Sequence, residues 1–463
     1  MSASPAQTIG DKLAAHIART SLKDIPAAAV NAARQVLLDT IAVGWAATDL
    51  PGSRPMRDLA VREGGAADAT LLAYGERVPA GAAALVNGTF AAALDYDCLH
   101  ESSVMHCDAV ILPAALAMAE RQGASGEEFL CAVTLGNDLA CRLGLSQRDN
   151  PPGWFASSIF GCIAAAATCA KLLKLDARGI RNAMGIAFSN AAGTRQPIIE
   201  RNYTKRMQTA FAAQTGVQAA LLAQAGVNGP AAFLEGEAGV WALYGKGDAD
   251  AVLKDLGKTY ANAEISLKKF PSCAGNHCAI EGALRIVHGN GLKPQDIKHA
   301  TLTVTPFIEK ITGQPFNPGA DPQVDAQFNL YYSVASVLLR GHLSVEDIQP
   351  PAVLDPAIRP MIDRIEMVVD RGLNTKLSPV TVEIATNDGR KFREHVPYLP
   401  GTPETPLSAD EIDAKFRDCV AQGVDPLEAD RARLLVERVR GIESLPDMRQ
   451  FFDGIAHGAR RAA

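Results

Sequence analysis

Six ionisable side chains lie within fourteen residues, immediately before an apolar run rich in alanine and leucine. They are Asp95, Asp97, His100, Glu101, His106 and Asp108. Histidine and carboxylate groups can transfer protons near neutral pH, and burial of so many unpaired charges beside a core segment would be costly. The stretch therefore indicates either a cleft for proton chemistry or surface charges that pair with lysines and cap the following helix.

A cluster of four cations lies at the start of a long predicted helix, where the helix dipole already favours anions. The cluster comprises Arg195, Arg201, Lys205 and Arg206. Guanidinium and ammonium groups neutralise carboxylates, so the cluster suits a substrate with several of them. The alternative is a solvated basic face.

A third group runs from Lys268 to His277 and contains two lysines, a thiol and an imidazole. Cys273 and His277 are four residues apart, which places them on one face of a helix start. They could act as a nucleophilic or proton-transfer pair, or Cys273 could be a packed structural thiol. Tyr332, at the start of another helix, could direct its hydroxyl into a cleft or pack in the core.

Composition narrows the class of protein. The chain has 463 residues, 48% of them hydrophobic and 21% charged, which is an ordinary globular balance. The net charge of −6 argues against a nucleic-acid partner. Nine cysteines without a C-x-x-C motif indicate reduced thiols in the cytoplasm. We expect no secretory signal, no membrane span, no nucleotide cofactor and no metal, because none of their sequence patterns occurs.

Helical periodicity dominates the chain up to residue 265, with predicted helices at 109–121, 126–145, 157–173, 176–192 and 202–225. Three β-rich segments follow, at 301–307, 365–370 and 380–396, and the last is a hairpin around Asn387-Asp388-Gly389. Helices are expected between them, at 276–289 and 326–340. After residue 400 helices return at 408–422, 426–441 and 445–455.

We therefore predict a mainly α protein with two domains. Residues 1–265 and 401–463 would form a large discontinuous all-helical domain, and residues 266–400 a smaller α+β lid domain. A cleft between two domains is a favoured ligand site.

Four segments, in this order, resemble the MmgE/PrpD family, which includes 2-methylcitrate dehydratases, cis-aconitate decarboxylases and an iminodisuccinate epimerase. They read ALDYDCLH…HCDAVILPAALAMAE, NYTKRMQTAFAAQTGVQAALLAQAGVNGP, EGEAGVWALYG and KKFPSCAGNH. The resemblance extends over most of the chain. It implies a helical domain with an α+β lid, a homodimer, and chemistry on di- or tricarboxylates without a metal or an organic cofactor.

By position, the residues that match the family's active site are Asp95, His106, Lys205, Lys268, Cys273, His277 and Tyr332. Further candidates for substrate binding are Arg206, Asp108, Asp97 and Arg201. The chain also departs from the family pattern. Cys98-Leu99 replaces Asp-Thr, Cys107-Asp108 replaces Pro-Ser, and Phe155 and Gln208 stand where relatives have histidine.

These residues predict a lyase that removes a proton next to a carboxylate, with loss of water. His106 would be the general acid or base, oriented by Asp95, while Lys205, Lys268 and Arg206 would hold carboxylates. Tyr332, or Cys273 with His277, would be the second proton-transfer group. The same carbanion could instead lead to epimerisation or decarboxylation, and the missing imidazoles also allow an inactive homologue that only binds polycarboxylates.

Overall fold

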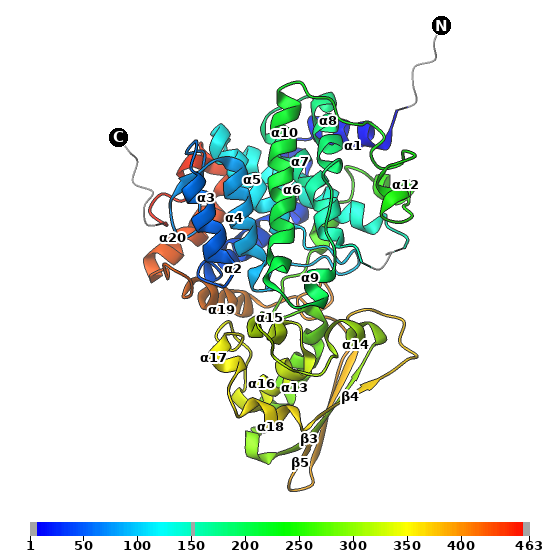
Figure 1. The fold of residues 1–463 in the computed structure, drawn as a ribbon, viewed down its shortest axis with the longest axis vertical. Coiled ribbons are helices and arrows are strands. Elements are labelled where there is room, and N and C mark those ends of the chain that lie inside the picture. The colour runs from blue at the N-terminus through cyan, green and yellow to red at the C-terminus, as the bar shows by residue number, and fades with distance from the viewer. Residues whose placement is uncertain (1–6, 150–152, 457–463) are drawn as a thin grey trace.

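A computed structural model describes residues 7–149 and 153–456. Residues 1–6 and 457–463 lie outside the described residues. The first of these ranges belongs to the N-terminal stretch in which we expect no targeting signal. The chain is mainly helical and carries a small mixed sheet in its C-terminal region (Figure 1). The domain boundaries at residues 265 and 400 stay a prediction.

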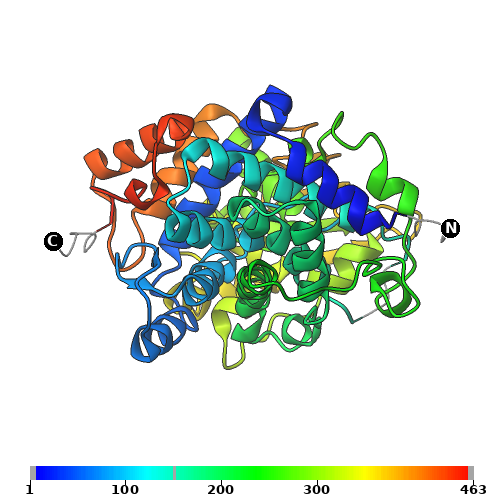
Figure 2. The same ribbon diagram turned by 90° about the horizontal axis from the view of Figure 1, so that it is seen from above.

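A bundle of helices forms the upper part of the molecule in Figure 1. The helices that come before residue 265 are α1 (Ile9–Arg19), α2 (Ala27–Ala46), α3 (Ser53–Glu63), α4 (Ala80–Ala93), α5 (Asp108–Gln122), α6 (Gly126–Leu145), α7 (Ala156–Leu172), α8 (Ala177–Phe188), α9 (Gln196–Ile199), α10 (Gln208–Gln224), α11 (Val240–Leu243) and α12 (Ala249–Leu253). Two short antiparallel strands, β1 (Ala69–Thr70) and β2 (Arg77–Val78), pair beside them. After the sheet region the chain returns to the bundle as α19 (Ala409–Val420) and α20 (Ala429–Arg440). Figure 2 shows α20 and α12 on opposite sides of the bundle.

The core of the bundle is built from α4, α5, α7 and α10, which pack on one another. Small side chains explain how closely they approach. A Cβ atom added to Gly216 of α10 would lie 2.4 Å from the Cβ atom of Ala165 in α7, so only glycine fits there. Nearly every residue of α7 is buried. The alanine-rich sequence thus sets a close-packed scaffold for the loops at the lower ends of these helices.

The lower part of the molecule combines the sheet with helices. Its strands are β3 (Ile297–Val304), β4 (Ile365–Val369), β5 (Val380–Thr386) and β6 (Lys391–Val396), in the order β4-β3-β5-β6. β3 and β4 are parallel, and the other pairs are antiparallel. The helices here are α13 (Ala274–Asn290), α14 (Pro306–Thr312), α15 (Pro322–Gln327), α16 (Leu330–Arg340), α17 (Pro350–Val353) and α18 (Ile358–Ile362). α13 packs on β5 and β6, which buries one face of the sheet.

The predicted hairpin, the strand at 365–370 and the five predicted helices up to residue 225 are confirmed to within a few residues, except that the last helix begins at Gln208 after a 3₁₀ turn, Tyr203–Met207. Two predictions are wrong. Residues 445–455 form only a 3₁₀ turn at Met448–Gln450, because Arg438 donates to the carbonyl oxygens of Gln450 and, at 2.9 Å, Phe451, which a continuing helix would use as acceptors. The helix predicted at 326–340 is interrupted because Asn329 accepts a hydrogen bond from the Tyr332 N–H and starts α16 anew.

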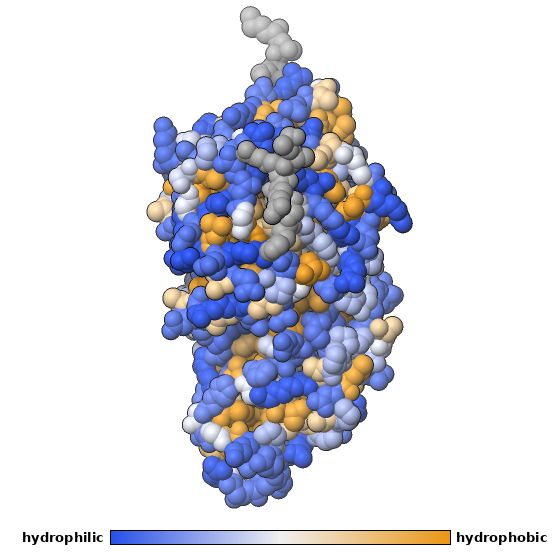
Figure 3. All heavy atoms as spheres, turned by 90° about the vertical axis from the view of Figure 1, so that its left-hand side faces the viewer, coloured by the Kyte–Doolittle hydropathy of each residue, from blue (hydrophilic) through white to orange (hydrophobic). Residues whose placement is uncertain are grey.

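The surface seen in Figure 3 is mainly hydrophilic, with small hydrophobic patches scattered over both parts. Among the described residues, no helix is both long and apolar enough to cross a membrane. All nine cysteines are free thiols, as the sequence predicts.

Candidate active site

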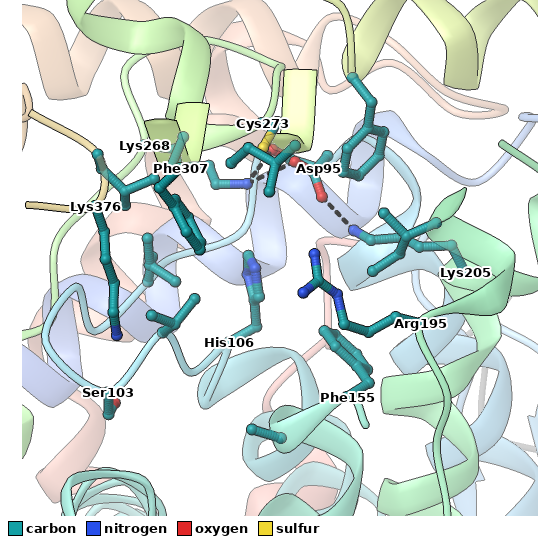
Figure 4. A pocket seen from close by; sticks show the side chains of 18 of the residues that line it. Asp95, Ser103, His106, Phe155, Arg195, Lys205, Lys268, Cys273, Phe307 and Lys376 are labelled. Atoms are coloured by element: carbon teal, nitrogen blue, oxygen red, sulfur yellow. Dashed lines mark hydrogen bonds and ion pairs between the residues drawn. The ribbon is translucent and has the colours of Figure 1, made fainter. Parts of the chain in front are cut away.

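A pocket of about 180 Å³ lies where the helical part meets the α+β part. Its floor is the loop between α4 and α5, which carries the acidic and histidine residues. The helical part also contributes the turn at 154–156 and the segment 195–205, while the α+β part contributes residues 268–274, 307–311 and 376–377. Figure 4 shows these side chains converging from both parts. The predicted cleft location agrees with this arrangement.

Asp95 joins two lysines that are far apart in the sequence. Its carboxylate is buried and forms ion pairs with Lys205 and with Lys268, the latter at 2.9 Å. Burial alone would raise the pKa of Asp95, but the two ammonium groups outweigh it and hold this pKa well below its usual value. Likewise, burial would lower the pKa of Lys268, but Asp95 and Asp97 raise it. Asp95 and Lys268 are therefore both charged at neutral pH.

The ammonium groups keep donors for a ligand. Lys268 donates to the Asp95 carboxylate and, at 2.6 Å, to its carbonyl oxygen, so one N–H is left. Lys205 donates to Asp95 alone among the described residues, which leaves two. Asp95 itself has a φ of 50°, a left-handed backbone that aspartate tolerates better than most residues. The loop is thus shaped to point this carboxylate at both lysines.

His106 pairs with a different carboxylate from the predicted one. Its Nδ1 lies 2.9 Å from Oδ2 of the buried Asp97, while Asp95 is engaged by the lysines. Its backbone N–H donates to the Ser157 hydroxyl at 3.0 Å, which anchors the loop to the start of α7. Since Asp97 takes Nδ1, Nε2 is the ring nitrogen left for a ligand in the pocket that His106 lines. A carboxylate that orients an imidazole in this way is a common arrangement for a general acid or base.

Three further polar side chains reach the pocket. Cys273 lies at the N-terminus of α13, and its burial and the nearby Asp95 raise the pKa of its thiol, so it is protonated at neutral pH. Arg195 and Lys376 lie on either side of His106 in Figure 4. Neither forms an ion pair with any residue that the structure describes. Their charges are therefore available to a ligand.

Two of the predicted catalytic residues do not line the pocket. His277 is fully buried, and its Nε2 lies 3.1 Å from the Ser272 carbonyl oxygen. Burial and the charge of Lys268 lower its pKa to about 3, so it is neutral. The Tyr332 hydroxyl donates to the Asp347 carbonyl oxygen, and burial raises its pKa to about 12. These contacts engage both polar groups away from the pocket.

The candidates for substrate binding also divide. The Arg206 guanidinium is buried, donates to the Pro51 carbonyl oxygen at 2.6 Å and bonds Gln323. Arg201 donates to the Ile311 carbonyl oxygen at 3.1 Å and lies over the Phe328 ring. Neither lines the pocket.

Asp97 and Asp108 also lie behind the pocket wall. Asp97 reaches the pocket only through His106. Asp108 accepts a hydrogen bond from Asn137 at 2.7 Å, and burial raises its pKa to about 6. Lys376 does line the pocket. The sequence gives no signal for it, because it lies in a loop outside all of the motifs described above.

Comparison with known protein families matches two family models to most of the chain. The MmgE/PrpD N-terminal domain matches residues 11–252, and the MmgE/PrpD C-terminal domain matches residues 270–440. The chain belongs to the MmgE/PrpD family. The resemblance read from the four motifs is thereby confirmed.

Curated relatives within the MmgE/PrpD family bear on the activity. The chain is 27% identical over 456 residues to the cis-aconitate decarboxylase-like protein oryM of Aspergillus oryzae, which covers 93% of this chain and 94% of the relative. It is 24% identical to a cis-aconitate decarboxylase of Aspergillus terreus, over 92% of this chain and 91% of the relative. It is 25% identical to the human cis-aconitate decarboxylase, over 80% of this chain and 78% of the relative. The family and these relatives support an enzyme, a lyase or decarboxylase.

Some positions at which this chain departs from the family pattern line the pocket, and others lie outside it. Leu99 and Phe155 line the pocket and make it more apolar than a threonine and an imidazole would. Gln208 lies outside it, where its Nε2 donates to the Thr194 carbonyl oxygen at 2.6 Å. Cys98 and Cys107 are buried behind the loop. Among the described residues, no three His, Cys, Asp or Glu side chains gather in a way that could hold a metal ion.

Proposed function

We propose that this MmgE/PrpD enzyme is a cofactor-independent lyase that removes a proton next to a carboxylate of a small di- or tricarboxylate, with loss of water. One observation carries the proposal: an imidazole oriented by a buried carboxylate faces a pocket in which cations outnumber anions. Lys205, Lys268, Arg195 and Lys376 stand against Asp95 and Asp97. The surplus positive charge suits a substrate with at least two carboxylates.

In the first step, His106 removes the proton from the substrate carbon. Nε2 takes the proton from the carbon next to a carboxylate, and the imidazolium that forms is stabilised by Asp97. The spare N–H groups of Lys205 and Lys268 bind that carboxylate and stabilise the negative charge that spreads onto its oxygens. Because Asp95 fixes both ammonium groups in advance, little reorganisation accompanies the step.

Loss of water completes the reaction. The C–O bond to a hydroxyl on the neighbouring carbon breaks, a C=C bond forms, and the proton on His106 passes to the departing hydroxyl as water. One imidazole thus serves as base and then as acid, which requires both groups to leave from the same face of the substrate. The neutral Cys273 thiol, on the pocket wall, can donate a hydrogen bond to a second carboxylate.

Decarboxylation is a second candidate, because the relatives are cis-aconitate decarboxylases or a protein like them. In this reaction a C–C bond breaks, carbon dioxide leaves, and the same kind of carbanion is protonated by His106. Apolar side chains that line the pocket, such as Phe155, would favour loss of a carboxylate by withholding water from it.

A panel assay separates these outcomes. The protein is incubated in D₂O with 2-hydroxy and unsaturated di- and tricarboxylates, and NMR spectra record deuterium uptake and products, with gas release followed in parallel. We expect deuterium exchange and formation of a C=C bond, both abolished in His106→Gln. Gas release identifies a decarboxylase, and exchange with inversion but no net reaction identifies an epimerase. Absence of both exchange and product across the panel would refute the proposal.

The homodimer, the lid function of residues 266–400 and the cytoplasmic location belong to the same proposal. The family resemblance supports the first two. The free cysteines support the third, since thiols persist in a reducing compartment.

A further inference from the structure

The pocket has an apolar wall that a small polycarboxylate would not use. We define this wall by five large side chains, two from the turn after residue 153, one from α9 and two from α14: Trp154, Phe155, Ile198, Phe307 and Ile311. Four of them are partly exposed, and Trp154 is 42% exposed. Large apolar side chains left partly open inside a pocket are typical of a site that binds apolar groups.

The charged groups of the pocket already account for the carboxylates. Carboxylates placed against the apolar wall would lose water without gaining a partner. A hydrocarbon group there would gain about 25 cal/mol for each Å² that it removes from water. The wall is therefore complementary to the part of a ligand that carries no charge.

The Phe155 ring marks the end of the apolar wall that lies next to His106. Its centroid lies 6.5 Å from that of His106, so the wall starts beside the proposed base. The backbone holds it there, since the Phe155 N–H donates to the Gly193 carbonyl oxygen at 3.1 Å. Gly193 has a φ of 140°, and an added Cβ atom would lie 2.6 Å from the Cβ atom of Ser158. Only glycine permits this approach, so the turn that carries Phe155 is fixed in place.

We infer that the substrate is a di- or tricarboxylate with a hydrocarbon branch larger than a methyl group, and that Phe155 selects for this branch. The inference rests on the proposed function, whose substrate class it narrows. The wall draws on three separate segments of the chain, so a single methyl group cannot contact all of it. The branch leaves the skeleton at or beside the carbon that loses its proton, because the wall begins at the base.

The test measures binding, which does not depend on turnover. Succinate and its methyl, ethyl, propyl and butyl derivatives are titrated calorimetrically into the full chain. Each added methylene group that reaches the wall should lower Kd about fourfold, from about 0.8 kcal/mol per buried CH₂. In Phe155→His this dependence should fall to less than half, whereas Phe211→His, the same change at an exposed site on α10, should keep it. Ile198→Thr provides a second test if Phe155→His does not fold.

The results that overturn the inference are distinct from a failure of the proposed function. A Kd that stays constant or rises with branch length in the unmodified protein overturns the inference. A second result would also overturn it: Phe155→His lowers turnover of branched and unbranched substrates equally and leaves the binding series unchanged. In that case the apolar wall would serve a departing carboxylate instead of a branch. Absence of any exchange or product, with the binding series intact, would refute the lyase and leave the inferred ligand class standing.

Discussion

Asp97 offers the sharpest test of the proposed chemistry, because it touches His106 and does not line the pocket. Asp97→Asn keeps the size of the side chain and removes its charge. The amide N–H₂ would face Nδ1 as a donor, which favours the tautomer with the proton on Nε2. That tautomer cannot accept a proton from the substrate.

The magnitude follows from the geometry. Two unit charges 4 Å apart interact by about 4 kcal/mol at an effective dielectric constant of 20, and Nδ1 lies 2.9 Å from Oδ2 of Asp97. The imidazolium formed in the reaction would lose about 3–5 kcal/mol of stabilisation, which corresponds to a fall in kcat of about 10²–10⁴-fold. KM should change little, because the carboxylate-binding cations are untouched.

The assay is deuterium exchange at the substrate carbon, followed by NMR at saturating substrate. Asp138→Asn is a matched control: this buried carboxylate pairs with Arg142 at 2.8 Å and does not line the pocket. It should reduce thermal stability and leave kcat within about threefold of the original. A loss below threefold in Asp97→Asn, or an equal loss in Asp138→Asn, would refute the role of the His106–Asp97 pair.

Three further predictions concern the groups around this pair. Asp95→Asn leaves two buried ammonium groups unpaired and should cost about 3–5 kcal/mol, lowering Tm by several degrees. The pKa of Asp95 is held below its usual value in the folded protein, so the stability that its charged form provides is present above about pH 4 and is lost as the pH falls further. The difference in Tm between the original protein and Asp95→Asn should therefore narrow below that pH. A difference that stays constant would contradict the pairing of Asp95 with the two lysines. Arg195→Leu should raise KM about tenfold with kcat nearly unchanged, from the loss of one charge-assisted hydrogen bond of about 1.5–3 kcal/mol, weakened by exposure; steady-state kinetics decide. Tyr332→Phe should keep turnover within a few-fold, because its hydroxyl binds a carbonyl oxygen outside the pocket, and a hundredfold loss would restore it as an acid–base group.

Local signals in the sequence predicted local structure well. Asn387-Asp388-Gly389 has the turn chemistry of a hairpin, and β5 and β6 pair across it. Ser408 and Glu411 form the capping box that starts α19. Asp95, Lys205, Lys268 and His106 are brought together as the motifs suggested, because polar groups in otherwise apolar segments must meet a partner when buried.

The rest depended on geometry that spacing does not convey. Lys205 and Arg206 are adjacent, but they lie in a 3₁₀ helix, where successive side chains diverge by about 120°. Lys205 therefore reaches Asp95 while Arg206 binds Pro51 and Gln323 outside the pocket. Lys376 reaches the pocket from the loop before β5, which Thr305 anchors by donating its hydroxyl to the Lys376 carbonyl oxygen at 2.7 Å, a contact between residues 71 positions apart.

The division of the pocket between the two parts of the molecule has an evolutionary consequence. The proposed base, His106, and Asp97 beside it sit on one loop of the helical part, whereas Phe307, Ile311 and Lys376 line the pocket from the α+β part. Substitutions between residues 300 and 380 can therefore change which acid is accepted and leave the proton-transfer step intact. A chain built in this way can diversify its substrates by drift in this segment, and libraries aimed at new substrates should combine it with Phe155 and Ile198 of the apolar wall.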